Sequence, residues 1–313
     1  MAAQPTTTRP ADGLLGGLIA GRTLHQRQVR VAYLFLLPSI LYVCLMFVAP
    51  AFYAVYLSMV DWGIDGPRAF VGFDNYVYVA TDDRFWATMV NTAYFALLEV
   101  PGTIVCSLLI ALALTTSAGL RAREFFRLVY FLPVVTSLVA VAYMWLYLYN
   151  PTIGVFNSLL TSVGLPRQPW LSSTDQVIPA LAVVDVWARL GFNMVIFVAG
   201  LEGIPKDYYD AAKIDGANGW ARFWRITLPL LNPQIVLVAV LEAIHALRIF
   251  ALPYVATAGG PADASRTVVM QIYDQAFRWN NMGEAAVTSM YLFAAILIIT
   301  VIQRKVLTRA VDY

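Results

Sequence analysis

"YYDAAKIDGANGWARFWRITLPLLNP", residues Tyr208–Pro233, is a polar segment with an unusual position in this chain. Apolar runs over approximately Ile178–Gly200 and Ile235–Val255 flank it on the two sides. Each run has the length of about 20 residues that a helix needs to cross a lipid bilayer. The sequence therefore predicts that this polar segment connects two membrane spans.

The composition of the whole chain agrees with a membrane protein. Of the 313 residues, 60% are hydrophobic and only 13% are charged, whereas a soluble domain carries about 25% charged residues. Cys44 and Cys106 lie inside apolar runs, so we expect two small buried hydrophobic side chains. His25 and His245 are too few and too far apart to suggest a metal site.

Six apolar runs are long and unbroken, unlike the short alternating strands of a membrane β-barrel. They predict an all-α membrane protein with six transmembrane helices. The runs are approximately Val31–Met59, Thr92–Thr115, Leu128–Tyr149, Ile178–Gly200, Ile235–Val255 and Ala286–Ile302.

Basic residues between these runs predict the orientation, because cytoplasmic loops are enriched in Lys and Arg. Fourteen lie in the N-terminal segment, the second and fourth loops and the C-terminal tail, and five lie on the other side. Both chain ends are therefore expected in the cytoplasm. We divide the chain into a cytoplasmic segment over 1–30, which contains a short surface helix over Leu14–Gly21, and a six-helix domain over 31–313. The opening segment then lies in a cytoplasmic loop over 201–234.

Motifs of catalytic or nucleotide sites are missing from the sequence. The chain has no G-x-x-x-x-G-K-[ST], H-E-x-x-H or C-x-x-C pattern, and no loop combines Ser, His and Asp as a nucleophile would require. We therefore expect no catalytic residues, no metal, no cofactor in this chain and no nucleic-acid partner. If ATP drives the protein, another subunit must bind that ATP.

Ionisable residues within the spans are costly in lipid and indicate candidate function. Asp185 and Arg189 are four residues apart on one helical face, with Asn193 one turn further. They form either a structural ion pair or a polar patch along a solute path. Glu242 and His245 are close enough to pair, whereas Glu99 is expected in a structural role. The candidate substrate-path residues are Asp185, Arg189, Asn193, Glu242, Arg248, Phe250 and Tyr254.

The opening segment carries ordered helix signals. Pro205 suits the first turn of a helix, and "KDYYDAAKID" can form two to three turns. Gly216 suits the left-handed position that follows a helix end. A second short helix can run from Ala217 to Arg225. These signals predict a compact helix–glycine–helix element.

The same segment resembles the EAA loop of permease subunits of binding-protein-dependent ABC importers. That pattern runs E-A-A, two residues, D-G-A, then Phe, Ile, L-P and a final Pro. The matching residues here are Asp210-Ala211-Ala212, Asp215-Gly216-Ala217, Phe223, Ile226, Leu228-Pro229 and Pro233. Asp210 departs from the pattern, because it stands where the family has Glu and is one carbon shorter.

Other stretches look like the carbohydrate branch of this family, which includes maltose and glycerol-3-phosphate permeases. They are "FVGFDNYVYVATDDRFWATMVNT" (Phe70–Thr92), "AGLEGIPKDYYDAA" (Ala199–Ala212) and "IFALPYVATAGGP" (Ile249–Pro261), the last being more similar to the first of the two paired permeases. The resemblance implies a type I ABC importer permease fold in a bacterial or archaeal inner membrane.

The resemblance also implies a set of partners. Two ATP-binding subunits would hold ATP and Mg²⁺, an extracytoplasmic solute-binding protein would deliver cargo, and a second permease, a different chain, would complete the path through the lipid. The residues implied to dock on the ATP-binding subunit are Tyr209, Asp210, Ala211, Ala212, Asp215, Gly216 and Ala217.

Two functions are compatible with these observations. The first is an ATP-driven importer of a sugar, an oligosaccharide or a related polyol such as glycerol-3-phosphate. The second is a transporter driven by an ion gradient, in which Asp185, Glu242 and His245 relay protons. The EAA-like segment favours the first, because a secondary transporter has no ATPase cleft to occupy.

Overall fold

The computed structural model describes residues 24–63, 66–116 and 120–307. The chain divides into two compact units, residues 1–57 and 58–313, and each is considered by itself. The surface helix predicted over Leu14–Gly21 lies outside the described residues.

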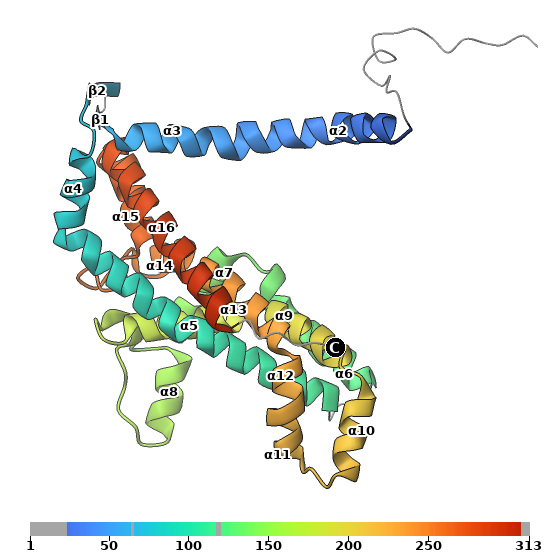
Figure 1. Cartoon of the computed structure of the whole chain (residues 1–313). Coiled ribbons are helices and arrows are strands. Elements are labelled where there is room, and N and C mark those ends of the chain that lie inside the picture. The colour runs from blue at the N-terminus through green and yellow to red at the C-terminus, as the bar shows by residue number, and fades with distance from the viewer. Residues whose placement is uncertain (1–23, 64–65, 117–119, 308–313) are drawn as a thin grey trace, which may run out of the picture. The chain divides into compact units, whose positions relative to one another are not determined.

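The described residues of the first unit form one long helix, whose last residue, Ser58, is the first of the second unit. This helix consists of α2 (Leu24–Val43), a π-helical turn η1 (Cys44–Val48) and α3 (Ala49–Ser58), joined by helical residues (Figure 1). The stretch Gln28–Ser58 is long and apolar enough to cross a membrane. Its large apolar side chains are exposed on all sides, which is typical of a helix whose surroundings are lipid or another chain. The predicted first helix is confirmed.

The second unit begins with a short β-hairpin and then forms a helical bundle. Strands β1 (Val60–Gly63) and β2 (Gly66–Phe70) are antiparallel. Helices α4 (Asp74–Thr81) and α5 (Asp83–Thr116) follow, and α16 (Met282–Leu307) is the last helix of the described residues (Figure 1). Helices α5 and α16 correspond to the second and sixth predicted apolar helices, and both are long and apolar enough to cross a membrane.

Helix α9 (Val177–Glu202) is the centre of the bundle. In its most apolar window 56% of residues are buried, compared with 33% in α5 and 28% in α16. Its side chains join both of the larger core clusters. Gly191 permits close packing on this helix, because a Cβ there would lie 2.2 Å from the carbonyl oxygen of Tyr130. Helix α9 corresponds to the fourth predicted apolar run and is long and apolar enough to cross a membrane.

The third apolar run is broken, which corrects the prediction of one continuous helix. It forms α6 (Leu120–Val135) and α7 (Leu138–Leu148), which meet at an angle of 100°. Pro133 has no amide hydrogen to donate within α6, and Ser137 has extended backbone angles of φ −58° and ψ 128°. Hydropathy alone does not reveal such a break, because apolar residues continue on both sides of it.

The fifth run also differs from its prediction. Helix α13 (Asn232–Leu247) ends before Arg248, and α14 (Ala251–Thr257) starts after Phe250, whose φ and ψ are −136° and −60°. The described residues thus contain four helices suited to cross a membrane, or up to six if the α6–α7 pair and the pair Gly219–Leu230 and Asn232–Leu247 each count as one span.

The connecting segments contain further short helices. They are α8 (Val155–Ser162), η2 (Trp170–Ser172), α15 (Val268–Tyr273) and the π-turn η4 (Asp274–Arg278). Cys44 and Cys106 are exposed free thiols, so the expectation of burial is wrong. A membrane helix can present apolar side chains outward, and hydropathy therefore does not imply burial inside the chain.

Residues 206–230 form a helical hairpin, which we call the loop hairpin. Its first helix, α10, covers Lys206–Ile214 and begins directly after Pro205. The amides of Gly216 and Ala217 donate to the carbonyls of Lys213 (3.1 Å) and Ala212 (2.8 Å), which is the Schellman arrangement. Gly216 has a φ of +77°, so the prediction of a left-handed glycine at this position is confirmed.

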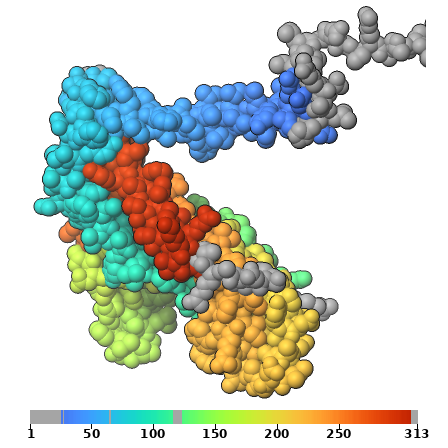
Figure 2. Space-filling model, in the orientation of Figure 1, coloured from blue at the N-terminus to red at the C-terminus, as the bar shows by residue number. Residues whose placement is uncertain are grey.

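The second arm of the loop hairpin starts two residues later than predicted. Asn218 caps α11 (Gly219–Arg222) by accepting a hydrogen bond from the amide of Ala221 at 2.8 Å. The arm continues through the π-turn η3 (Phe223–Thr227) and α12 (Leu228–Leu230). The hydroxyls of Tyr209 and Thr227 lie 3.0 Å apart and join the two arms. Figure 2 shows the loop hairpin as a lobe that stands out from the bundle.

The contact between Tyr209 and Thr227 yields a test of hairpin rigidity. In Tyr209→Phe we expect faster hydrogen exchange of the backbone amides in α10, because one hydrogen bond contributes about 1 kcal/mol to keeping the arms together. Tyr208→Phe is the matched control, since Tyr208 is exposed. Equal exchange in both variants would contradict a structural role for this contact.

Candidate functional site

The centre of the second unit contains an ion pair between α9 and α13. The Arg189 guanidinium donates twice to the Glu242 carboxylate, from Nε to Oε2 and from Nη2 to Oε1 at 2.8 Å. Asn193 Nδ2 donates to the same Oε1 at 2.8 Å. Glu242 is fully buried, and the Arg189 side chain is 26% exposed. A bidentate pair of this kind is both strong and geometrically specific.

A second pair joins the same helices. His245 Nε2 lies 2.9 Å from Asp185 Oδ2, and the Asp185 side chain is 1% exposed. The sequence suggested pairs within each helix, Asp185 with Arg189 and Glu242 with His245. The structure instead pairs each carboxylate with a base on the other helix, because the two polar faces meet in the bundle interior. We call these four residues the interhelical charge cluster.

Glu99 on α5 adds a third carboxyl group beside this cluster. It is completely buried, and it interacts electrostatically with Asp185, Glu242 and Arg189. Thr103 donates to its Oε1 at 2.8 Å, whereas its Oε2 has no hydrogen-bond partner among the described residues. Glu99 is buried, as its expected structural role requires, but it lies beside the charge cluster, so three helices contribute to one polar centre. Glu99 is far in sequence from Asp185 and Glu242, so residue spacing could not predict that these carboxyl groups lie together.

A cavity of about 290 Å³ opens beside the interhelical charge cluster, and we call it the break cavity. Its wall comes from the α6–α7 break, from α9 and from α13. The lining residues are Pro133, Val134, Thr136, Leu138, Asp185, Ala188, Arg189, Phe192 and His245. Asp185 and Arg189, predicted from the sequence, thus line a cavity, and Thr136, Phe192 and His245 join them. The helix break that hydropathy missed supplies the remaining wall.

Three other predicted path residues lie apart from this cavity. Arg248 is exposed at the end of α13. Phe250 and Tyr254 stack with ring centroids 4.9 Å apart, and both contact Tyr273. The aromatic residues therefore form a separate group, which Arg278 joins with its guanidinium 5.9 Å from the Tyr254 ring centre.

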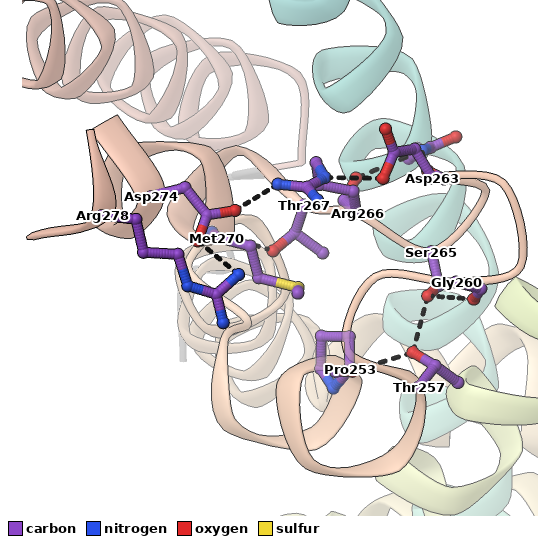
Figure 3. A network of polar contacts seen from close by, with 11 residues as sticks. Pro253, Thr257, Gly260, Asp263, Ser265, Arg266, Thr267, Met270, Asp274 and Arg278 are labelled. Carbon is purple, nitrogen blue, oxygen red and sulfur yellow. Dashed lines mark hydrogen bonds and ion pairs between the residues drawn. The ribbon is translucent and has the colours of Figure 1, made fainter. Parts of the chain in front are cut away.

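This aromatic group adjoins a polar network that orders the segment between α14 and η4 (Figure 3). Asp274 is paired with Arg266 and, at 3.1 Å, with Arg278. Asn91 of α5 donates to the carbonyls of Asp263 and Arg266 at 3.0 and 3.1 Å. These bonds make the segment a fixed surface attached to α5 rather than a loose loop.

The loop hairpin presents a mixed polar and apolar surface. Of the predicted docking residues, Asp210, Ala211, Asp215 and Gly216 are exposed, whereas Tyr209, Ala212 and Ala217 are partly buried. A hydrogen bond from Lys213 holds the pKa of Asp210 below its usual range, so Asp210 is ionised at neutral pH. Large exposed side chains that the sequence reading did not single out are Ile214, Trp220 and Trp224. Ile214, 87% exposed, could have been found as an apolar residue on an otherwise polar helix.

The base of the loop hairpin is tied to α6. Glu202, the last residue of α9, pairs with Arg123 and with Arg127, the latter at 3.0 Å. This link connects the hairpin to the helix whose other end forms the wall of the break cavity. Among the described residues, no group of three or more His, Cys, Asp or Glu side chains could hold a metal ion.

Comparison with known proteins identifies the family of this chain. The model of the "Binding-protein-dependent transport system inner membrane component" family matches residues 103–312. A solved alginate ABC transporter, in complex with a periplasmic protein that binds an alginate pentasaccharide, has a similar chain with a TM-score of 0.79 and 22% identity. The match covers 91% of this chain and 98% of that one, so the fold is shared over nearly the full length.

Sequence relatives agree with this fold. The trehalose/maltose permease MalF of Thermococcus litoralis is 31% identical over 90% of this chain and 95% of its own length. The sn-glycerol-3-phosphate permease UgpA of Agrobacterium fabrum is 31% identical over 90% of this chain and 96% of its own. This chain therefore belongs to the family of inner-membrane permease components of binding-protein-dependent ABC transport systems.

Proposed function

We propose that this chain is a permease subunit of an ATP-driven importer and forms part of the translocation path for a sugar, an oligosaccharide or a related polyol. The observation that carries the proposal is the loop hairpin. It combines the Asp210–Ala217 motif with a rigid turn and an exposed surface, and it stands out from the bundle (Figure 2). The named solutes of the two sequence relatives support the solute class.

The loop hairpin suits a docking element because its exposed face is small and rigid. Ala211 and Gly216 permit close approach of a partner, and Ile214 offers an apolar anchor. The Schellman turn and the contact between Tyr209 and Thr227 hold the two arms together. Two ATP-binding subunits, which would hold ATP and Mg²⁺, supply the complementary clefts: one for this hairpin and one for that of a second permease.

Force on the loop hairpin reaches the solute path by a short route. The hairpin connects α9 directly to α13, and the interhelical charge cluster ties these two helices to each other. Glu202 transmits the same movement to α6 through Arg123 and Arg127. The break cavity lies where α9 and α13 meet the α6–α7 break. A movement of the hairpin therefore alters the cavity walls.

The full topology of this proposal has six spans, with both chain ends and the loop hairpin in the cytoplasm, as the 14-to-5 distribution of basic residues indicates. The segment between α14 and η4 then faces the outside, where a solute-binding protein would dock. A second permease of different sequence would complete the path and cover part of the exposed α2–α3 helix.

Uptake into proteoliposomes tests the energy source. The purified complex, reconstituted with its solute-binding protein, is expected to accumulate radiolabelled solute only with enclosed ATP and Mg²⁺. An ionophore that removes the proton and sodium gradients should leave that uptake unchanged, because hydrolysis supplies the energy. Uptake that persists without ATP and collapses with the ionophore would instead establish the ion-gradient mechanism.

Ile214→Glu tests the docking surface. We expect the dissociation constant for the ATP-binding subunits to rise about 10- to 100-fold, since a charge would replace an apolar anchor. Affinity is measured by titration of the detergent-solubilised permease pair. Leu159→Glu on α8 is the matched control, because Leu159 is an exposed apolar helix residue in another part of the chain. A similar loss of affinity in both variants, or in neither, would argue against docking through α10.

A further inference from the structure

We propose that the break cavity selects an uncharged, hydroxyl-rich solute and discriminates against anionic solutes. This inference rests on the proposed function, in which the cavity belongs to the translocation path. It goes further by assigning a charge class to the cargo, which the sequence left open because Arg189 alone would suit an anion.

Among the described residues that line the cavity, neither Arg189 nor His245 is without an acidic partner. Arg189 donates to both oxygens of Glu242, and His245 pairs with Asp185. Glu99 is a third carboxyl group in the same centre. The wall contributed by α6 and α7 consists of Pro133, Val134, Thr136 and Leu138 and adds no charge.

Protonation of His245 and Glu99 does not give this centre a net positive charge. Three carboxylates face one guanidinium, so a neutral His245 leaves an excess of two negative charges. A protonated His245 leaves one, and a neutral Glu99 in addition brings the sum to zero. An anion entering the cavity thus meets a neutral or negative centre, in an interior where charges are weakly screened.

Polar groups at the cavity that have no hydrogen-bond partner favour a solute with hydroxyl groups. A guanidinium has five N–H donors, and Arg189 uses two of them, which leaves three without a partner among the described residues. Thr136 donates to the Leu132 carbonyl at 3.0 Å, so its oxygen can still accept. Asp185 also lines the cavity, and its Oδ1 has no partner within the described part of the chain. A sugar or polyol both donates and accepts, and Phe192 offers a ring for its apolar face.

The solutes named for the two relatives differ in this property. Trehalose and maltose are uncharged, whereas glycerol-3-phosphate is an anion. The charge balance of the break cavity assigns this chain to the uncharged class, although its sequence identity to both relatives is the same 31%.

Thiol labelling measures the charge of the cavity without knowledge of the cargo. Thr136→Cys is introduced together with Cys44→Ala and Cys106→Ala, and the assembled transporter is treated with a cationic trimethylammonioethyl or an anionic sulfonatoethyl methanethiosulfonate. Rates are normalised to those of the same reagents with free 2-mercaptoethanol. We expect the cationic reagent to react at least about tenfold faster, which corresponds to about 1.4 kcal/mol of difference.

Matched variants make the result specific. Leu159→Cys on α8 should give a ratio near one, and Glu242→Gln added to Thr136→Cys should lower the ratio, because Arg189 then lacks its carboxylate. Leu138→Cys, on the α7 side of the same cavity, replaces Thr136→Cys if that variant does not assemble. Equal rates, faster reaction of the anionic reagent, or no labelling at either cavity position would overturn the proposal.

Uptake separates this inference from the proposed function. ATP-dependent uptake of an anionic sugar at the rate of its neutral counterpart, tested with trehalose 6-phosphate and trehalose, would overturn the charge selectivity and leave the importer function intact. Loss of ATP dependence would overturn the importer function and would leave the labelling ratio unaltered.

Discussion

The buried carboxylate of Glu242 is the constraint on which the arrangement of the bundle depends. An ionised carboxylate without a partner in the interior destabilises a protein by about 3–5 kcal/mol, so α13 must lie where a base can reach it. Arg189 on α9 provides that base, and Asn193 adds a further donor. In the second pair, about one turn away, α9 provides the buried carboxylate of Asp185 and α13 provides the base, His245. Together these contacts fix both the distance and the register between α9 and α13.

This constraint explains how one polar segment can act on a distant cavity. The loop hairpin joins the two helices that the charge cluster binds, so all three elements form one mechanical piece. Beside this piece lies α6, which Glu202 links to the base of the hairpin through Arg123 and Arg127, and the other end of α6 forms the break. Movement of this piece together with α6 is therefore expected to shift them against α7 at the break, where the break cavity lies. The charged residues serve both to hold the helices and to set the cavity's polarity.

Much of the helical fold could be predicted from the sequence, because long apolar runs indicate helices suited to lipid. The helix end at Gly216 was also predictable, since the left-handed turn requires a residue without a Cβ. The break after Val135 was not, because a proline inside an apolar run can either kink a helix or end it. The partners of Asp185 and Glu242 could not be predicted from the sequence either. Spacing identifies which residues share a face, but the meeting of two faces depends on packing across residues far apart in the chain.

A double-mutant cycle on Arg189 and Glu242 tests the central claim most directly. Thermal unfolding of the purified transporter is measured for Arg189→Met, Glu242→Gln and the double variant, with Asp185→Asn and Arg189→Met as the comparison cycle within α9. If the two helices are held by cross-helix pairs, Arg189→Met lowers the melting temperature more than the double variant does, and the coupling exceeds that of Asp185 with Arg189. Additive effects in the first cycle, or stronger coupling in the second, would contradict the account.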